Sequence, residues 1–231
     1  MNNLILPKDA EKKLVTPKHH STTDWDFGGS GNTYYADFTL SSNRYVSAST
    51  CLCTTPHTYP QAATGWFFLK SPTNIRDGKM SVWMNYPSTF GGWVAPKLIF
   101  NAQAESANNG ELPANCFFVD PANNLVRKRV AGSNTDISSL FSPAFSMTTD
   151  VWYRLQVQWY SWRFSVSETR AHITVSNTTS TPIVMAEFDY DNTTFYASST
   201  NLVGISQSTY DYEVFYYDDV EVYIRNPMPS V

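Results

Sequence analysis

Charge is scarce in this sequence. Only 16% of its 231 residues are Asp, Glu, Lys or Arg, against about 25% in an average soluble protein. The formal net charge is −4, and no basic run is longer than Arg127, Lys128 and Arg129. Because a nucleic-acid site needs clustered positive charge to neutralise phosphates, we expect no nucleic-acid partner.

Long apolar runs are also missing. No stretch approaches the roughly 18 consecutive apolar residues of a membrane helix, so we expect no membrane span. The first apolar stretch, Leu4, Ile5 and Leu6, is too short for the core of a secretory signal peptide. Ser, Thr, Asn and Tyr replace the missing charge, as in secreted and virion proteins. We expect an extracellular or virion-surface protein, whose signal was removed before this numbering or which leaves the cell by virus assembly.

Cysteine is scarce too. Cys51, Cys53 and Cys116 cannot all pair within one chain, and two cysteines at adjacent same-face positions of one strand rarely form a disulfide. Two interpretations stay open: three buried thiols, or one bridge from Cys51 or Cys53 to Cys116. A Cys-x-Cys metal site would need a second pair of ligands, so we do not expect one.

Sustained helical periodicity is missing, and short segments of period two take its place. In 152–160, for example, bulky apolar residues fall at every second position, as in a strand with one buried side. Clusters of Gly, Pro, Asn and Ser separate these segments. The pattern predicts an all-β fold, with strands at 34–40, 45–49, 65–69, 79–86, 96–103, 115–120, 124–130, 152–160, 170–176, 183–190, 203–207 and 214–224.

Residues 1–23 differ from the rest of the chain. They contain four lysines and the pair His19 and His20, with Pro7 and Pro17 on either side of a short stretch. We interpret them as an N-terminal arm that is disordered or docks on a neighbouring virion or self subunit. Residues 24–231 are long enough to form one domain with its own core.

Six segments between residues 65 and 223 follow a distinctive order. They are a Trp-containing strand at 79–85, a strand at 97–103, a hairpin at 116–128, an Asp-Val-Trp-Tyr opening at 150–153, a Leu-Val-Gly-Ile-Ser stretch at 202–206 and an Asp-Asp-Val stretch at 218–220. This order resembles the concanavalin A-like lectin/glucanase superfamily, which includes laminin G-like domains. The resemblance implies a two-sheet antiparallel jelly-roll sandwich. It implies little about activity, since the fold carries lectins, enzymes and structural modules.

Aromatic residues are abundant, at 15% of the chain. Sugar recognition uses flat rings against C–H faces, with amide or guanidinium groups on hydroxyls. The loop 85–93 is the best binding-loop candidate, and the polar sides of 96–103 and 152–160 are either a sugar-binding surface or ordinary solvated faces. Trp83, Trp152 and Trp159 are expected in the core. The candidate glycan-binding residues are Tyr86, Trp93, Lys97, Asn101, Gln103, Arg154, Gln156 and Trp162.

The resemblance also implies a structural calcium site away from the sugar surface. Asp24 and Asp26 lie near the first strand, and Asp218 and Asp219 near the last. Hard oxygen ligands on adjacent strands suit calcium. The alternative is that Asp24 and Asp26 form turns and that Asp218 lies at a strand end.

Catalytic motifs are missing. The resemblance implies that glycosidases of this fold carry alternating carboxylates on one strand, and here only Glu187 and Asp189 offer such a spaced pair. Alginate-lyase relatives imply a Gln-x-His strand, but the matching stretch reads Gln156-Val-Gln158. No nucleophile elbow is present. We therefore favour a protein that is not an enzyme.

The sequence thus predicts a non-catalytic glycan-binding or surface-attachment β-sandwich, displayed extracellularly or on a virus particle. Its expected partners are polysaccharides or glycoprotein glycans. One alternative is a structural virion protein, a capsid decoration or tail component, that docks through residues 1–23; another is a divergent polysaccharide lyase or glycoside hydrolase. Asn177 and Asn192 begin N-glycosylation motifs, both expected in turns that tolerate a glycan.

Overall fold

The computed structural model describes residues 11–13, 25–30, 38–46, 50–54, 63–70, 74–85, 96–104, 112–121, 123–138, 148–162, 165–177, 183–196, 198–209 and 214–225. These residues confirm the all-β prediction. Their elements are β1 (Glu11–Lys13), β2 (Trp25–Ser30), β3 (Phe38–Ser41), β4 (Cys51–Thr54), β5 (Ala63–Leu69), β6 (Gly78–Asn85), β7 (Lys97–Ala102), β8 (Cys116–Asp120), β9 (Leu125–Val130), β10 (Ser133–Ser138), β11 (Trp152–Trp162), β12 (Ser165–Asn177), β13 (Ile183–Tyr190), α1 (Thr193–Tyr196), β14 (Leu202–Thr209) and β15 (Tyr216–Arg225).

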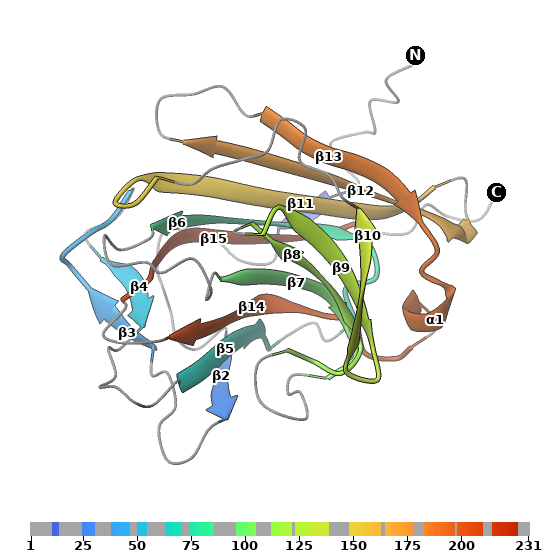
Figure 1. The fold of residues 1–231 in the computed structure, drawn as a ribbon, viewed down its shortest axis with the longest axis horizontal. Coiled ribbons are helices and arrows are strands. Elements are labelled where there is room, and N and C mark those ends of the chain that lie inside the picture. Colours follow the sequence, from blue (N-terminus) through green and yellow to red (C-terminus); the bar gives the residue numbers. More distant parts are fainter. Residues whose placement is uncertain are drawn as a thin grey trace.

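The strands form two antiparallel sheets, which confirms the predicted jelly-roll sandwich (Figure 1). One sheet has eight strands, in the order β13-β12-β11-β6-β15-β4-β3, with β1 paired to β15. The other has seven, in the order β10-β9-β8-β7-β14-β5-β2. Figure 1 shows β11, β12 and β13 along its upper side and β14, β5 and β2 below them. Each sheet buries one face against the other, as in other sandwiches.

The core between the sheets is rich in aromatic rings. The ring of Trp159 on β11 lies 5.3 Å from that of Phe100 on β7, which stacks on Phe117 of β8 at 5.5 Å. All three side chains are fully buried. Aromatic pairs contribute about 0.5–1.5 kcal/mol beyond the burial of their area, so these contacts stabilise the junction of the two sheets.

A second apolar cluster covers the outside of the seven-stranded sheet. We call it the outer apolar cluster; it consists of Phe68, Ile99, Ala102, Leu112, Cys116, Phe118 and Leu202, with Trp66 packed against it. Gly204 on β14 leaves the space that this cluster needs. A Cβ atom at Gly204 would lie 2.6 Å from Cδ1 of Phe68 and 2.3 Å from the carbonyl oxygen of Phe67.

Two bulges move side chains from one face to the other. Asn101 has a φ of 49° where the register between β7 and β14 shifts. Ala102 therefore lies in the outer apolar cluster, although strict alternation would place it in the core. In β15, Asp219 has a φ of 44° where the register with β6 shifts. As a result Tyr217 and Val220, three positions apart, both face the core.

The strand predictions fail in two ways: one range is misplaced, and several strands are missed. The prediction at 45–49 is wrong at its start, because Tyr45 and Val46 lie outside any strand, and its remainder lies outside the described residues. The sequence did not predict β1, β2, β4 or β10. The residues of β10 are almost all polar, so no alternation marks them, and only pairing with β9 makes them a strand.

The three cysteines are free thiols. Cys51, Cys53 and Cys116 are all buried, which confirms the interpretation without a disulfide. Burial raises the pKa of Cys51 and of Cys116 to about 12. Both thiols are therefore protonated at neutral pH.

Of the predicted arm 1–23, the structure describes 11–13. These residues pair with 223–225 of β15 in the same chain. The rest of the arm lies outside the described residues, and its docking on a neighbouring subunit stays a prediction.

Candidate functional site

The outside of the eight-stranded sheet is polar. Side chains alternate along each strand, and the pairing registers place the outward ones of neighbouring strands side by side. We call this surface the polar face. Its described side chains are Lys79, Ser81, Trp83, Trp152, Arg154, Gln156, Gln158, Tyr160, Arg170, His172, Thr174, Ser176, Glu187, Asp189, Glu221 and Tyr223.

One row of the polar face crosses five strands, from β13 to β15. It consists of Glu187, His172, Gln158, Lys79 and Tyr223, each opposite the next. Neighbouring strands lie about 4.8 Å apart, so the row is roughly 19 Å long. Lys79 Nζ lies 4.1 Å from the centroid of the Tyr223 ring, a cation–π contact.

Near the centre of the polar face a guanidinium is fixed beside an indole. Nη2 of Arg154 donates to Glu221 Oε2 at 2.9 Å and to Ser81 Oγ at 3.1 Å. Trp83 lies opposite Arg154 in the strand ladder, and Gln156 lies opposite Ser81. Trp83 and Gln156 are half-buried. We call these five residues the Trp83 site.

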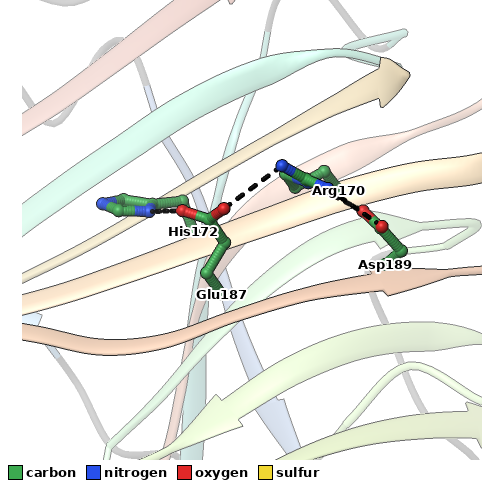
Figure 2. Close-up of polar contacts among 4 residues, drawn as sticks. All are labelled: Arg170, His172, Glu187 and Asp189. Atoms are coloured by element: carbon green, nitrogen blue, oxygen red, sulfur yellow. Dashed lines mark hydrogen bonds and ion pairs between the residues drawn. The ribbon is translucent and has the colours of Figure 1, made fainter. Parts of the chain in front are cut away.

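A second group of fixed charges joins β12 to β13 (Figure 2). Nε and Nη2 of Arg170 donate to the two carboxylate oxygens of Asp189, at 2.7 and 3.0 Å, and Nη1 donates to Glu187 Oε1 at 3.2 Å. The other oxygen of Glu187 lies 2.8 Å from Nδ1 of His172. Figure 2 shows Glu187 between His172 and Arg170. The hydrogen bond with Asp189 raises the pKa of Arg170. We call these four residues the His172 network.

A third arginine lies where β6 ends. Nη1 of Arg44 donates to Asn85 Oδ1 at 3.1 Å and to Asp150 Oδ1 at 2.7 Å. The Arg44 guanidinium also lies 5.5 Å from the centroid of the Tyr216 ring. The side-chain nitrogen of buried Asn85 has no hydrogen-bond partner among the described residues. The polar face therefore continues up to the end of β6.

The carboxylates of the polar face do not resemble a glycosidase pair. The standard mechanism needs two carboxyl groups with separate roles, one of which donates a proton. Glu187 and Asp189 both accept hydrogen bonds from Arg170 instead. We therefore assign no catalytic role to this pair.

The predicted glycan-binding residues divide between the two sheets. Arg154 and Gln156 lie together on the polar face, in β11 of the eight-stranded sheet. Lys97 lies on β7 of the seven-stranded sheet, and Gln103 follows β7. Because the two sheets meet through their inner faces, one surface cannot include both groups.

Asn101 belongs to a buried amide network. It is fully buried, and its side-chain nitrogen donates to the Arg76 carbonyl oxygen at 3.1 Å. Its side-chain oxygen accepts from Asn192 at 3.3 Å. A buried amide cannot reach a surface ligand, so the prediction that Asn101 binds glycans is corrected. Asn192 is itself fully buried, which corrects the expectation of an exposed glycosylation site there. Asn177, also expected in a turn, is instead the last residue of β12 and pairs with Tyr153 of β11.

Three predicted aromatic residues cannot be placed in the site. Tyr86 and Trp93 lie outside the described residues. Trp162 is the last residue of β11, paired with Ser165, and its side chain also lies outside the description. Their role in glycan binding stays a prediction.

The predicted calcium ligands are not brought together by the described residues. Asp218 is fully buried, and its carboxylate accepts from the backbone N–H of Val46 at 2.5 Å and of Asp219 at 2.8 Å. Asp26 lies on β2 of the other sheet, and Asp24 lies outside the description. Within the described ranges, no group of three or more His, Cys, Asp or Glu side chains could hold a metal ion. The carboxylate of Asp218 is thus already used by backbone N–H groups, and a role of Asp219 in a calcium site stays a prediction.

Sequence reasoning missed Trp83 and His172. Trp159 is in the core as expected, but Trp83 and Trp152 are half-buried and lie outside the core, so the expectation for these two residues is wrong. Alternation with Met80, Val82 and Met84 on the core side was the available signal. No local signal could have paired His172 with Glu187, because only the register of β12 and β13 brings them together.

Comparison of the sequence with protein-family models and with curated proteins gives no match. Comparison of the structure does. The seed lectin of Lotus tetragonolobus matches with a TM-score of 0.59 at 8% identity, over 94% of this chain and 100% of the lectin. This chain has the concanavalin A-like fold. The exoplasmic/lumenal domain of VIP36, in its Ca²⁺/Man-bound form, matches with a TM-score of 0.58 at 13% identity, over 97% of this chain and 93% of that domain.

The likeness to these structures concerns the fold. A third example is the cellulose induced protein Cip1, with a TM-score of 0.51 at 12% identity, over 87% of this chain and 92% of Cip1. The metal-free form of the VIP36 domain matches about as well as the Ca²⁺-bound form, with TM-scores of 0.55 and 0.56. The likeness in fold therefore does not depend on bound calcium. Among the described residues, no helix has the length and apolar character to cross a bilayer.

Proposed function

We propose that this protein binds glycans through the polar face, with the Trp83 site at the centre. The observation that carries the proposal is a half-buried indole beside a guanidinium of fixed direction: Trp83 lies opposite Arg154, which Glu221 holds at 2.9 Å. An indole face packs well against the C–H face of a sugar ring. A fixed guanidinium and a neighbouring amide bond adjacent hydroxyl groups.

The fixed position of Arg154 supports the proposal energetically. Ordering one long side chain at an interface costs about 0.5–1.5 kcal/mol. Glu221 and Ser81 already hold Arg154 before any ligand arrives. A glycan would therefore meet a site that needs little rearrangement.

The comparisons support the same proposal. The Lotus tetragonolobus protein is a seed lectin, and the VIP36 domain has been solved with Man and with Man3GlcNAc. We propose polysaccharide or glycoprotein glycans as partners, met outside a cell or on a virus particle. A structural role in a virion, a divergent enzymatic activity and a calcium site near Asp24 and Asp26 stay predictions from the sequence.

A glycan array probed with the purified protein, with and without calcium, tests the proposal. Gln156→Ala and Arg154→Lys should each weaken binding to a hit about tenfold, the equivalent of one lost hydrogen bond of about 1.4 kcal/mol. Lys97→Ala is the control, because Lys97 lies on the other sheet and should not change the affinity. An array without hits contradicts the proposal, and so does binding that depends on Lys97 but not on Gln156.

A further inference from the structure

The His172 network takes no part in the Trp83 site, although both lie on the polar face. We infer that the network is a second subsite for the same ligand, and that this ligand is a linear, neutral oligosaccharide. The inference rests on the proposed function and extends it to a ligand class. Three features of the described residues carry it: the spacing of the two groups, the fixed geometry of the network and its charge.

The spacing suits a chain of several sugar rings. The outward residues of β11 run from Arg154 to Tyr160, and a strand rises about 3.4 Å per residue, so along β11 Gln158 lies roughly 14 Å and Tyr160 roughly 20 Å from Arg154. The register places Arg170 opposite Tyr160 and His172 opposite Gln158. A single sugar ring cannot reach from Arg154 to the network, whereas an extended chain lying along β11 can.

The network is fixed before a ligand binds. Three nitrogens of Arg170 donate to Asp189 and Glu187, and Glu187 also holds Nδ1 of His172. Glu187 and Asp189 are 48% and 51% exposed, and a carboxylate has about four acceptor positions. Their exposed oxygens can therefore accept hydroxyl groups without any change of rotamer. Such preorganisation favours binding.

The charge of the network selects the ligand class. One guanidinium lies between two carboxylates, so Arg170, Glu187 and Asp189 together carry a net negative charge. A uronate or sulfate group placed against Glu187 and Asp189 would be repelled, and juxtaposed like charges disfavour a partner strongly. Hydroxyl groups meet no such repulsion. The subsite therefore fits a neutral sugar and rejects an anionic one.

Calorimetric titration of the whole protein tests the inference, with the disaccharides and hexasaccharides of cellulose, xylan and mannan and with oligogalacturonate as probes. We expect the best neutral hexasaccharide to bind at least tenfold more tightly than its disaccharide, and oligogalacturonate to bind more weakly than either. Asp189→Asn and His172→Ala should remove most of the gain with length. Gln156→Ala should weaken short and long ligands alike.

Asp136→Asn is the matched control. Asp136 accepts from Arg127 at 2.6 Å on the β9–β10 hairpin, as Asp189 accepts from Arg170, but it lies on the other sheet. It should leave every affinity unchanged. Equal affinity for short and long ligands, a gain with length that survives Asp189→Asn and His172→Ala, or preference for oligogalacturonate overturns the subsite. Failure of every probe and every array glycan to bind contradicts the proposed function itself.

Discussion

The outsides of the two sheets carry opposite kinds of side chain. On the seven-stranded sheet, Phe68, Ile99 and Phe118 lie in one row across Gly204, and all are buried. On the eight-stranded sheet, the row from Glu187 to Tyr223 consists of polar or charged side chains that are partly accessible. A sheet that is buried on both sides gains stability from both, at about 25 cal/mol for each Å² of apolar area removed from water. Around Gly204 the seven-stranded sheet is thus buried on both sides, whereas the polar face of the other sheet is the surface for which we propose glycan binding.

The largest effect should come from removing a ring of the outer apolar cluster. Phe118→Ala leaves a cavity in a fully buried site and should lower the free energy of unfolding by about 3–5 kcal/mol. Thr174→Ala, on the polar face, should change it by less than about 0.5 kcal/mol. Urea unfolding measures both. Equal effects of the two substitutions would refute the difference between the faces.

A smaller loss of stability should follow from adding a Cβ atom at Gly204, between β14 and the outer apolar cluster. Gly204→Ala puts a Cβ atom 2.6 Å from the Phe68 ring and should cost about 1–3 kcal/mol. Gly132→Asn is the control: its φ is 85°, its surroundings are open, and Asn tolerates positive φ. Thermal unfolding of the two variants compares them. A neutral Gly204→Ala would mean that the outer apolar cluster is loosely packed.

The burial of Cys116 within the outer apolar cluster should appear as a pH dependence. Its pKa is raised from 9.0 to about 12 by desolvation, so above pH 9 the unfolded chain releases a proton that the folded chain keeps. Stability from this thiol is therefore complete below pH 9 and falls as the pH rises toward 12. The free energy of unfolding, measured from pH 8 to pH 11, should fall less steeply in Cys116→Ala. An unchanged slope would argue that the thiol is accessible.

The smallest effect should come from the exposed ion pairs of both sheets. Asp136→Asn and Asp189→Asn each remove an arginine contact at a half-exposed carboxylate and should cost less than about 1 kcal/mol. Their stabilities should match within error in urea, although only Asp189→Asn should affect glycan binding. A large loss of stability in Asp189→Asn alone would make the His172 network structural.

Much of the fold was predictable because β alternation is a local property. The period-two pattern of 152–160 identified β11 and the side chains that share its polar side, including Arg154 and Gln156. Prediction failed where alternation is broken or absent. The bulge at Asn101 turns the side chain of Ala102 from the core side of β7 to the outer side. In β10, no apolar residues occur at regular spacing. The candidate site was predicted in part for the same reason: its members on β11 were visible, but their partners on other strands were not.

The sequence by itself determined that this chain is an all-β sandwich with few charges and with aromatic residues on many strands. Those features depend on composition and on neighbours two positions apart. Only the tertiary structure decided that Arg154 meets Glu221, that His172 meets Glu187, and that Lys97 lies on the opposite side of the sandwich from Gln156. Such contacts depend on strand register and sheet order, which arise when residues far apart in the chain pack together.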